Sequence, residues 1–232
     1  MADRIMQKEV PSDFSGLMIK EEMVDIFDDF VALQQVYSAG IKEIRTKLEI
    51  LDEEFQVRFD HNPIHHMEYR LQSPKSILGK LNKKGLPLEV DVIRANLTDV
   101  AGVRVICNYV DDIYRIAELL ILQDDITLLE KKDYIKKPKE NGYRSLHLVV
   151  EVPIFLAENK QPIPVEIQIR TIAMDFWASL EHHLKYKTAT DVPDSVRQEL
   201  VECANTITKL DNKMQGIHNQ LTLSKRKKDK GI

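Results

Sequence analysis

Apolar residues in the first quarter of the chain recur at alternating steps of three and four positions. They are Ile41, Ile44, Leu48, Leu51 and Phe55. This spacing places them on one face of a helix, so we expect an amphipathic helix that ends near residue 59. The helical pattern begins at about residue 21, and Gly40 is expected to separate an earlier helix from the later one.

A short basic helix is predicted after a turn at residues 61–63. Ser73 is a typical N-cap, and Pro74 fits the first helical position, where the backbone N–H that proline lacks would have no partner in the helix. Gly85 suits the left-handed conformation that ends many helices, and it follows Lys83 and Lys84. We therefore expect a helix with a positively charged end.

The middle of the chain alternates between a period of two and a helical period. We expect strands at residues 103–110, 126–132, 144–152 and 165–170, and helices at 111–123, 171–187 and from Pro193 to about 221. This order favours an α/β fold, described equally well as α+β. Its expected form is a mixed sheet of about five strands flanked by helices.

The expected organisation is one sheet domain with helical extensions at both ends. The domain spans residues 21–187 and includes the N-terminal helices, residues 188–224 form the C-terminal helical extension, and residues 225–232 form a basic tail. The extension has a wider apolar face than a lone surface helix needs, so we expect it to contact another subunit. For the tail, a solvated end is favoured over a nucleic-acid contact.

Composition narrows the class of protein. The 232 residues are 43% hydrophobic and 30% charged, which suffices for a substantial core. Cys107 and Cys203 lie far apart and form no CxxC pair, which favours a reduced compartment. The N-terminus lacks the apolar run of a signal peptide and no segment is long enough to span a membrane, so we expect a cytoplasmic protein without a membrane partner. The net charge of −4 argues against a general nucleic-acid binder.

The strand at residues 165–170 carries a polar face. Side chains alternate across a strand, so Glu166, Gln168 and Arg170 are expected to project from the face opposite the valine and isoleucines. A solvent-exposed sheet face and the floor of an active site explain this pattern about equally well.

A second carboxylate, Asp99, precedes the strand that begins near Val103. Two carboxylates at adjacent strand ends can hold a magnesium ion together with substrate phosphates, although Asp99 taken alone is more typical of a turn or cap. Cationic and hydroxyl groups suited to phosphates occur around them in the sequence, including Arg70, Ser76, Lys80 and Arg104. Their clustering favours a phosphate site over a solvated surface.

A basic loop at residues 134–143 ends on Tyr143, and His147 follows in the next strand. The tyrosine could stack on a base while lysines such as Lys139 contact phosphates. The alternative is a strand-edge tyrosine whose ring is half-buried.

Four segments resemble the synthetase domain of the RelA/SpoT homologue superfamily. They are RLQSPKSILGK at residues 70–80, TDVAGVRVIC at 98–107, KDYIKKPKENGYRSLH at 132–147 and VEIQIRTIAMDFWASLEHHLKY at 165–186. The resemblance spans about residues 21–221. It implies a nucleotidyltransferase-like fold and a small single-domain alarmone synthetase without hydrolase activity, which moves the β,γ-pyrophosphate of ATP to the ribose 3′-hydroxyl of GDP or GTP. The products would be AMP and ppGpp or pppGpp, made for the stringent stress response.

The resemblance also implies a role for each matching residue. Asp99 and Glu166 would hold Mg, and Glu166 would also activate the 3′-hydroxyl. The ATP-binding residues would be Arg70, Ser76, Lys80 and Arg104. The residues expected to bind GDP or GTP are Lys139, Tyr143, His147, Gln168 and Asp175. Gln72 is a departure, because many members have a lysine there.

Small members of this family form homotetramers, so the resemblance also implies self-association. Two alternatives stay open: a nucleotidyltransferase that releases pyrophosphate, and a catalytically silent RNA-binding or regulatory module. The first usually has a Gly-Ser followed by an Asp-x-Asp pair, which this chain lacks. The second has no need of two carboxylates in an anion-binding cleft.

Overall fold

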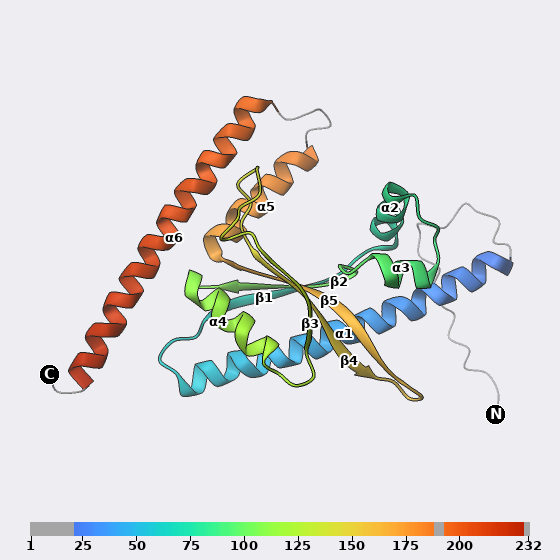
Figure 1. Ribbon diagram of the computed structural model, residues 1–232, viewed down its shortest axis with the longest axis horizontal. Coiled ribbons are helices and arrows are strands. Elements are labelled where there is room, and N and C mark those ends of the chain that lie inside the picture. Colours follow the sequence, from blue (N-terminus) through green and yellow to red (C-terminus); the bar gives the residue numbers. More distant parts are fainter. Residues whose placement is uncertain (1–20, 188–192, 230–232) are drawn as a thin grey trace.

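The computed structural model describes the backbone of residues 21–187 and 193–229, and within them the side chains of 28–184 and 193–224. A five-stranded sheet forms its centre (Figure 1). The strands are β1 (Ile64–Leu71), β2 (Ala101–Cys107), β3 (Thr127–Asp133), β4 (Leu146–Phe155) and β5 (Lys160–Thr171). The helices are α1 (Glu21–Arg58), α2 (Pro74–Lys84), α3 (Val90–Asn96), α4 (Val110–Ile121), α5 (Ile172–Lys187) and α6 (Asp194–Asp229).

The strand order is β1-β2-β5-β4-β3, and only the central pair of β2 and β5 is parallel. The expected mixed sheet of about five strands flanked by helices is therefore confirmed. Figure 1 shows α5 and α6 side by side near one end of the sheet, and α2 with α3 near the other. No described helix is long and apolar enough to cross a membrane.

The core lies between the sheet and α1, which packs on β2, β4 and β5. Val165, Ile167 and Ile169 of β5 are fully buried in it, while Glu166 and Gln168 between them are only partly buried. The predicted alternation is thus confirmed for these five residues. Arg170 is the exception, because its side chain is also buried.

The predicted basic helix is α2. The Ser73 hydroxyl accepts a hydrogen bond from the Ser76 amide at 3.3 Å, and Gly85 ends the helix with a φ of 66°. The predicted strands and the later helices are also present, with shifted ends: Val110, expected in a strand, begins α4. The helix α6 continues to Asp229, and the side chains of the predicted basic tail lie outside the described residues.

The expected break at Gly40 is wrong, because α1 is continuous from Glu21 to Arg58. A Cβ atom at this position would lie 2.9 Å from Ile163 Cγ2 and 3.3 Å from Val165 Cγ2. The glycine therefore lets the helix backbone approach β5 closely instead of ending the helix.

Two elements were missed. The edge strand β1 reads IHHMEYRL, and its polar residues hide the period of two. The helix α3 has only seven residues, too few to show a helical period.

Replacing Gly40 by alanine is expected to lower the free energy of unfolding by about 1–3 kcal/mol, because stiff, β-branched Ile163 cannot easily yield to the new methyl group. Urea unfolding measures the change. Gly79→Ala in α2 is the matched control: nothing lies within 4 Å of its Cβ position, so it should gain about 0.5–1 kcal/mol. Equal effects at both positions would contradict this interpretation of Gly40.

Candidate active site

A cavity of about 530 Å³ opens between α2 and the neighbouring ends of β1, β2 and β5. It is lined by Glu68, Tyr69, Arg70, Gln72, Ser76, Gly79, Lys80, Lys83, Asp99, Gly102, Val103, Arg104, Glu166 and Gln168. The predicted carboxylates and all the residues expected to bind ATP are among them. The structure therefore brings together groups from positions 68 to 168 of the chain.

The pairing of β2 with β5 explains this gathering. Gly102 lies opposite Glu166 and Arg104 opposite Gln168, so the polar faces of the two strands coincide. On the other side, β1 places Arg70 opposite Gly102. Because Gly102 has no side chain, the sheet surface between Arg70 and Glu166 stays open.

Asp99 lies just before β2 and forms an ion pair with Lys80 of α2. The helix thus presents its lysine to one of the two carboxylates rather than to solvent. Arg104 is also held by acids: its Nη1 lies 2.9 Å from Glu68 Oε2 and 3.5 Å from Asp175 Oδ1. The charges of the cavity are therefore largely balanced within the protein.

Glu166 is held by two neighbouring side chains. Gln168 Nε2 donates a hydrogen bond to its Oε2 at 2.9 Å, and His147 Nδ1 lies 3.2 Å from its Oε1. Burial alone would raise the pKa of Glu166, but these two hydrogen bonds and the nearby charges of His147 and Lys80 hold it below its ordinary value. The carboxylate is consequently ionised at neutral pH and can accept a hydrogen bond or a proton.

A second group of side chains continues from Glu166 away from the cavity. His147 Nε2 lies 2.8 Å from the hydroxyl of Tyr143, and Arg170 Nη2 donates to the same hydroxyl at 2.9 Å and to Gln168 Oε1 at 2.5 Å. Arg170 also approaches Asp175 Oδ1 at 3.3 Å. Four of the residues expected to bind GDP or GTP thus belong to one connected network.

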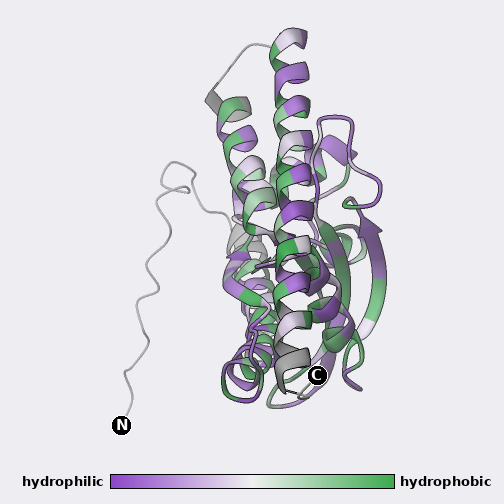
Figure 2. Cartoon of the chain, turned by 90° about the vertical axis from the view of Figure 1, so that its left-hand side faces the viewer, coloured by the Kyte–Doolittle hydropathy of each residue, from purple (hydrophilic) through white to green (hydrophobic). Residues whose placement is uncertain are grey.

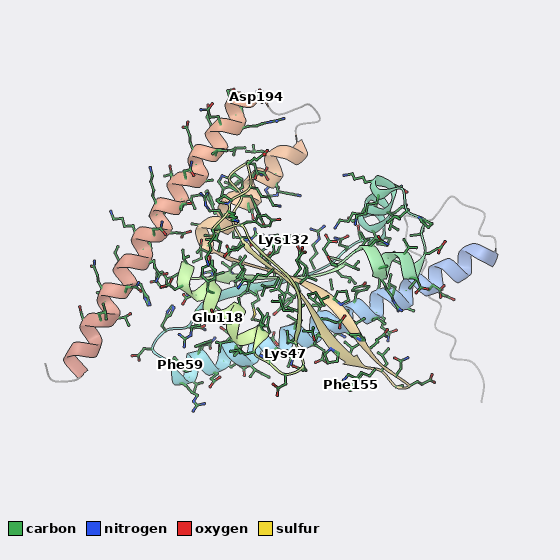
Figure 3. The ribbon with its side chains drawn as sticks, viewed as in Figure 1. Lys47, Phe59, Glu118, Lys132, Phe155 and Asp194 are labelled. Atoms are coloured by element: carbon green, nitrogen blue, oxygen red, sulfur yellow. The ribbon has the colours of Figure 1, made fainter. Side chains whose placement is uncertain are left out.

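Lys139 joins this group through its ammonium, which lies 4.9 Å from the centre of the Tyr143 ring. Burial raises the pKa of Tyr143, so its phenol stays neutral and keeps a proton to share. The ring is half-buried, as the alternative interpretation required, but it is also part of the network. Lys132 of β3 lies opposite His147 of β4 in the sheet. Its label in Figure 3 therefore shows where the network begins.

The support of the loop before Tyr143 was not foreseen. Gly142 has a φ of 88°, and a Cβ there would lie 2.7 Å from the Cβ of Ala204 in α6. Arg144 Nη1 donates to the Gly142 carbonyl at 3.2 Å, and its Nη2 donates to Asn205 Oδ1 of α6 at 3.3 Å. The sequence signal was the Asn141-Gly142 dipeptide, which marks a turn but not its partner.

The carboxylates of the cavity suit a hard cation whose remaining ligands come from a substrate. Among the residues with described side chains, no three His, Cys, Asp or Glu groups form a metal site. Asp99 and Glu166 supply two carboxylates to one cavity, which is the typical protein share of a magnesium site whose other ligands are phosphates and water.

The family model described as a region found in RelA / SpoT proteins matches residues 69–191, just over half of the 232 residues. The chain belongs to the RelA/SpoT family. The matched segment contains every residue that was expected to bind a nucleotide or metal.

Individual relatives cover most of the chain. The GTP pyrophosphokinase YwaC of Bacillus subtilis is 40% identical over 201 residues, covering 87% of this chain and 96% of the relative. The crystal structure of small alarmone synthetase 2 from B. subtilis has a TM-score of 0.76 at 42% identity, covering 83% of this chain and 99% of that one.

Small alarmone synthetase 1 from the same organism has been solved in two liganded states. Its complex with its product pppGpp has a TM-score of 0.74 at 37% identity, covering 79% of this chain and 93% of that one. Its complex with AMPCPP has a TM-score of 0.67 at 32% identity, covering 80% and 93%.

Acid is expected to remove the stabilisation that ionised Glu166 provides. Because the pKa of this carboxyl is lower in the folded protein than its ordinary 4.5, its contribution is complete above about pH 5.5 and declines as the pH falls below 4.5 towards the folded value. Urea unfolding of the wild type and Glu166→Gln should therefore give a difference that is constant near neutrality and shrinks in acid. A difference that grew on acidification would contradict the lowered pKa.

Proposed function

We propose that this protein is a GTP/GDP pyrophosphokinase that makes ppGpp or pppGpp and AMP from ATP and GDP or GTP. The observation that carries the proposal is the position of Glu166. Its carboxylate lines the cavity and also contacts His147, the start of the Tyr143 network. One ionised group thus borders two places where nucleotides could bind, and relatives have been solved with pppGpp and with AMPCPP.

The cavity is the proposed ATP site. Ser76 and Lys80 lie one turn apart on α2, whose N-terminal amides favour phosphate oxygens. Lys83 adds a cation to the same wall. Arg70 of β1 and Arg104 of β2 lie at the opposite wall, where their planar guanidinium groups suit the adenine ring.

The Tyr143 network is the proposed GDP or GTP site. The Tyr143 ring offers a surface on which guanine can stack, and Lys139 beside it offers a cation for phosphates. Asp175, in the first turn of α5, is the proposed hydrogen-bond acceptor for guanine N–H groups. Gln168 and His147 connect this site to Glu166.

The reaction joins the two sites. The 3′-oxygen of the guanosine nucleotide forms a bond to the β-phosphorus of ATP, and the bond from that phosphorus to the α,β-bridging oxygen breaks. AMP leaves with that oxygen, and Glu166 takes the proton of the 3′-hydroxyl. Mg, held by Asp99 and Glu166 when bound, supplies positive charge for the transferring phosphates. Lys80 keeps Asp99 in place and adds a further positive charge.

The wider assignments rest on the family. We propose a cytoplasmic enzyme of the stringent stress response that forms a homotetramer through the C-terminal helices. Support for self-association comes from exposed apolar side chains on α5 and α6, namely Phe176, Leu180, Leu210, Met214 and Ile217. Figure 2 shows hydrophobic and hydrophilic residues interspersed along the ribbons of these helices. The domain boundaries at 187 and 224 and the absence of hydrolase activity are part of the same proposal.

The proposal is tested by incubating the purified protein with ATP, magnesium and GDP or GTP and resolving the nucleotides by anion exchange. We expect AMP and a more highly phosphorylated guanosine nucleotide in equal amounts, and no synthesis with a chelator present. Release of pyrophosphate would favour the nucleotidyltransferase alternative. Absence of turnover, together with binding of RNA by the protein, would favour the regulatory module.

Glu166→Gln is expected to fold and to lower kcat by about a hundredfold or more, because the amide cannot take the hydroxyl proton. Initial rates at saturating nucleotides measure kcat, and thermal unfolding checks the fold. Glu118→Gln, which changes an exposed carboxylate on α4 outside the cavity, is the control and should keep the wild-type activity. Wild-type turnover of Glu166→Gln would remove this residue from the mechanism.

Tyr143→Ala is expected to raise the KM for the guanosine nucleotide about tenfold or more, because one stacking surface is lost, while the KM for ATP stays unchanged. Tyr143→Phe is the matched variant: it keeps the ring and loses the bonds to His147 and Arg170, so the rise should be only a few-fold. Equal increases in both KM values for Tyr143→Ala would place Tyr143 outside the acceptor site.

A further inference from the structure

Gln72 is a buried polar residue in the wall of the cavity. It directly follows β1, and its backbone N–H donates to the Val100 carbonyl at 2.9 Å, which fixes the main chain at this point. Only 5% of its surface is exposed, yet it lines the cavity beside Arg70 and Ser76. Its side-chain Oε1 has no hydrogen-bond partner among the residues with described side chains.

A buried amide oxygen without a partner destabilises the unliganded protein, since water would otherwise satisfy it. The lack of a partner for such an atom in a cavity wall is explained if a bound ligand donates the missing hydrogen bond. The terminal torsion of glutamine is broad, so rotation about it can change the direction in which the oxygen points.

The missing partner must be a hydrogen-bond donor. Phosphate oxygens of a nucleotide only accept hydrogen bonds at neutral pH, and the phosphate-binding cations Lys80 and Lys83 lie on α2. Gln72 is two residues from Arg70, so on an extended chain the two side chains project to the same side. Arg70 belongs to the wall assigned to the nucleoside.

We propose that Gln72 is a recognition residue for the donor nucleotide, whose side-chain oxygen accepts a hydrogen bond from a hydroxyl of the sugar or the amino group of the base. This inference rests on the proposed function, because it takes the cavity as the ATP site. A neutral acceptor here selects for the nucleoside.

The first test replaces Gln72 by methionine, which has a similar length and no group that needs a hydrogen bond. The dissociation constant of α,β-methylene ATP and the Tm of the unliganded protein are measured for each variant. Tyr37→Phe is the matched control, since the Tyr37 hydroxyl is also buried without a partner but lies in α1, away from the cavity.

We expect Gln72→Met to raise the Tm and to weaken α,β-methylene ATP binding by roughly three- to tenfold, with GDP binding unchanged. Tyr37→Phe should raise the Tm and leave binding of the ATP analogue unchanged. Unchanged binding of the ATP analogue by Gln72→Met overturns the proposal. So does equal weakening of ATP-analogue and GDP binding, since that indicates a structural role.

The second test uses the wild-type protein and so does not depend on a variant that folds. Binding of 2′-deoxy-ATP, 3′-deoxy-ATP and purine riboside triphosphate, which lacks the amino group, is compared with that of ATP. One of them should bind less tightly, and Gln72→Met should lose the preference for ATP over that analogue. If no analogue differs from ATP, Gln72 recognises no donor of the nucleoside and the proposal is wrong.

Different results would overturn the role of Gln72 and the proposed function. A wild-type protein that does not bind α,β-methylene ATP overturns the ATP site and Gln72 together. A protein that binds ATP but forms no guanosine product contradicts the proposed function alone, while the comparison of Gln72→Met with the wild type still decides the role of this residue.

Discussion

The parallel pairing between β2 and β5 determines where the groups of the site lie. It aligns Gly102 with Glu166 and Arg104 with Gln168, and the alternation of β5 buries Val165, Ile167 and Ile169 against the core on the opposite face. The hydrophobic burial that holds this strand in the sheet therefore also turns Glu166 and Gln168 towards the cavity. A slip of one residue would bury Glu166 and expose the isoleucines, so the register of the site is secured by the core.

Glu166 is the point at which the two halves of the site meet. On one side lie the α2 cations and Asp99, and on the other a chain of hydrogen bonds runs from His147 through Tyr143 to Arg170. These partners keep the carboxylate ionised although it is partly buried. Helix α6 contributes at a distance, because Ala204 lies against Gly142 before Tyr143 and Asn205 accepts a hydrogen bond from Arg144 after it. The position of Tyr143 thus depends on contacts with the C-terminal helix.

Much of this arrangement follows from the sequence, because the β5 alternation and the α2 caps are local signals. The residues expected to bind nucleotides were found through motifs, and the structure shows them in two adjacent groups. Gly40 was misinterpreted because the close approach of β5, which explains a glycine inside a helix, is a tertiary contact. The burial of Arg170 and the docking of α6 on Gly142 were equally out of reach, since both depend on segments distant in the chain.

The central claim is that Glu166 separates a donor site from an acceptor site and serves the acceptor hydroxyl. A crystal structure with α,β-methylene ATP, magnesium and GDP bound together tests it most directly. We expect the ATP phosphates beside Ser76 and Lys80 and the guanine on the ring of Tyr143. The ribose 3′-hydroxyl should lie within about 3.2 Å of a Glu166 oxygen. A guanosine nucleotide bound away from Tyr143, or a 3′-hydroxyl beyond the reach of Glu166, would contradict it.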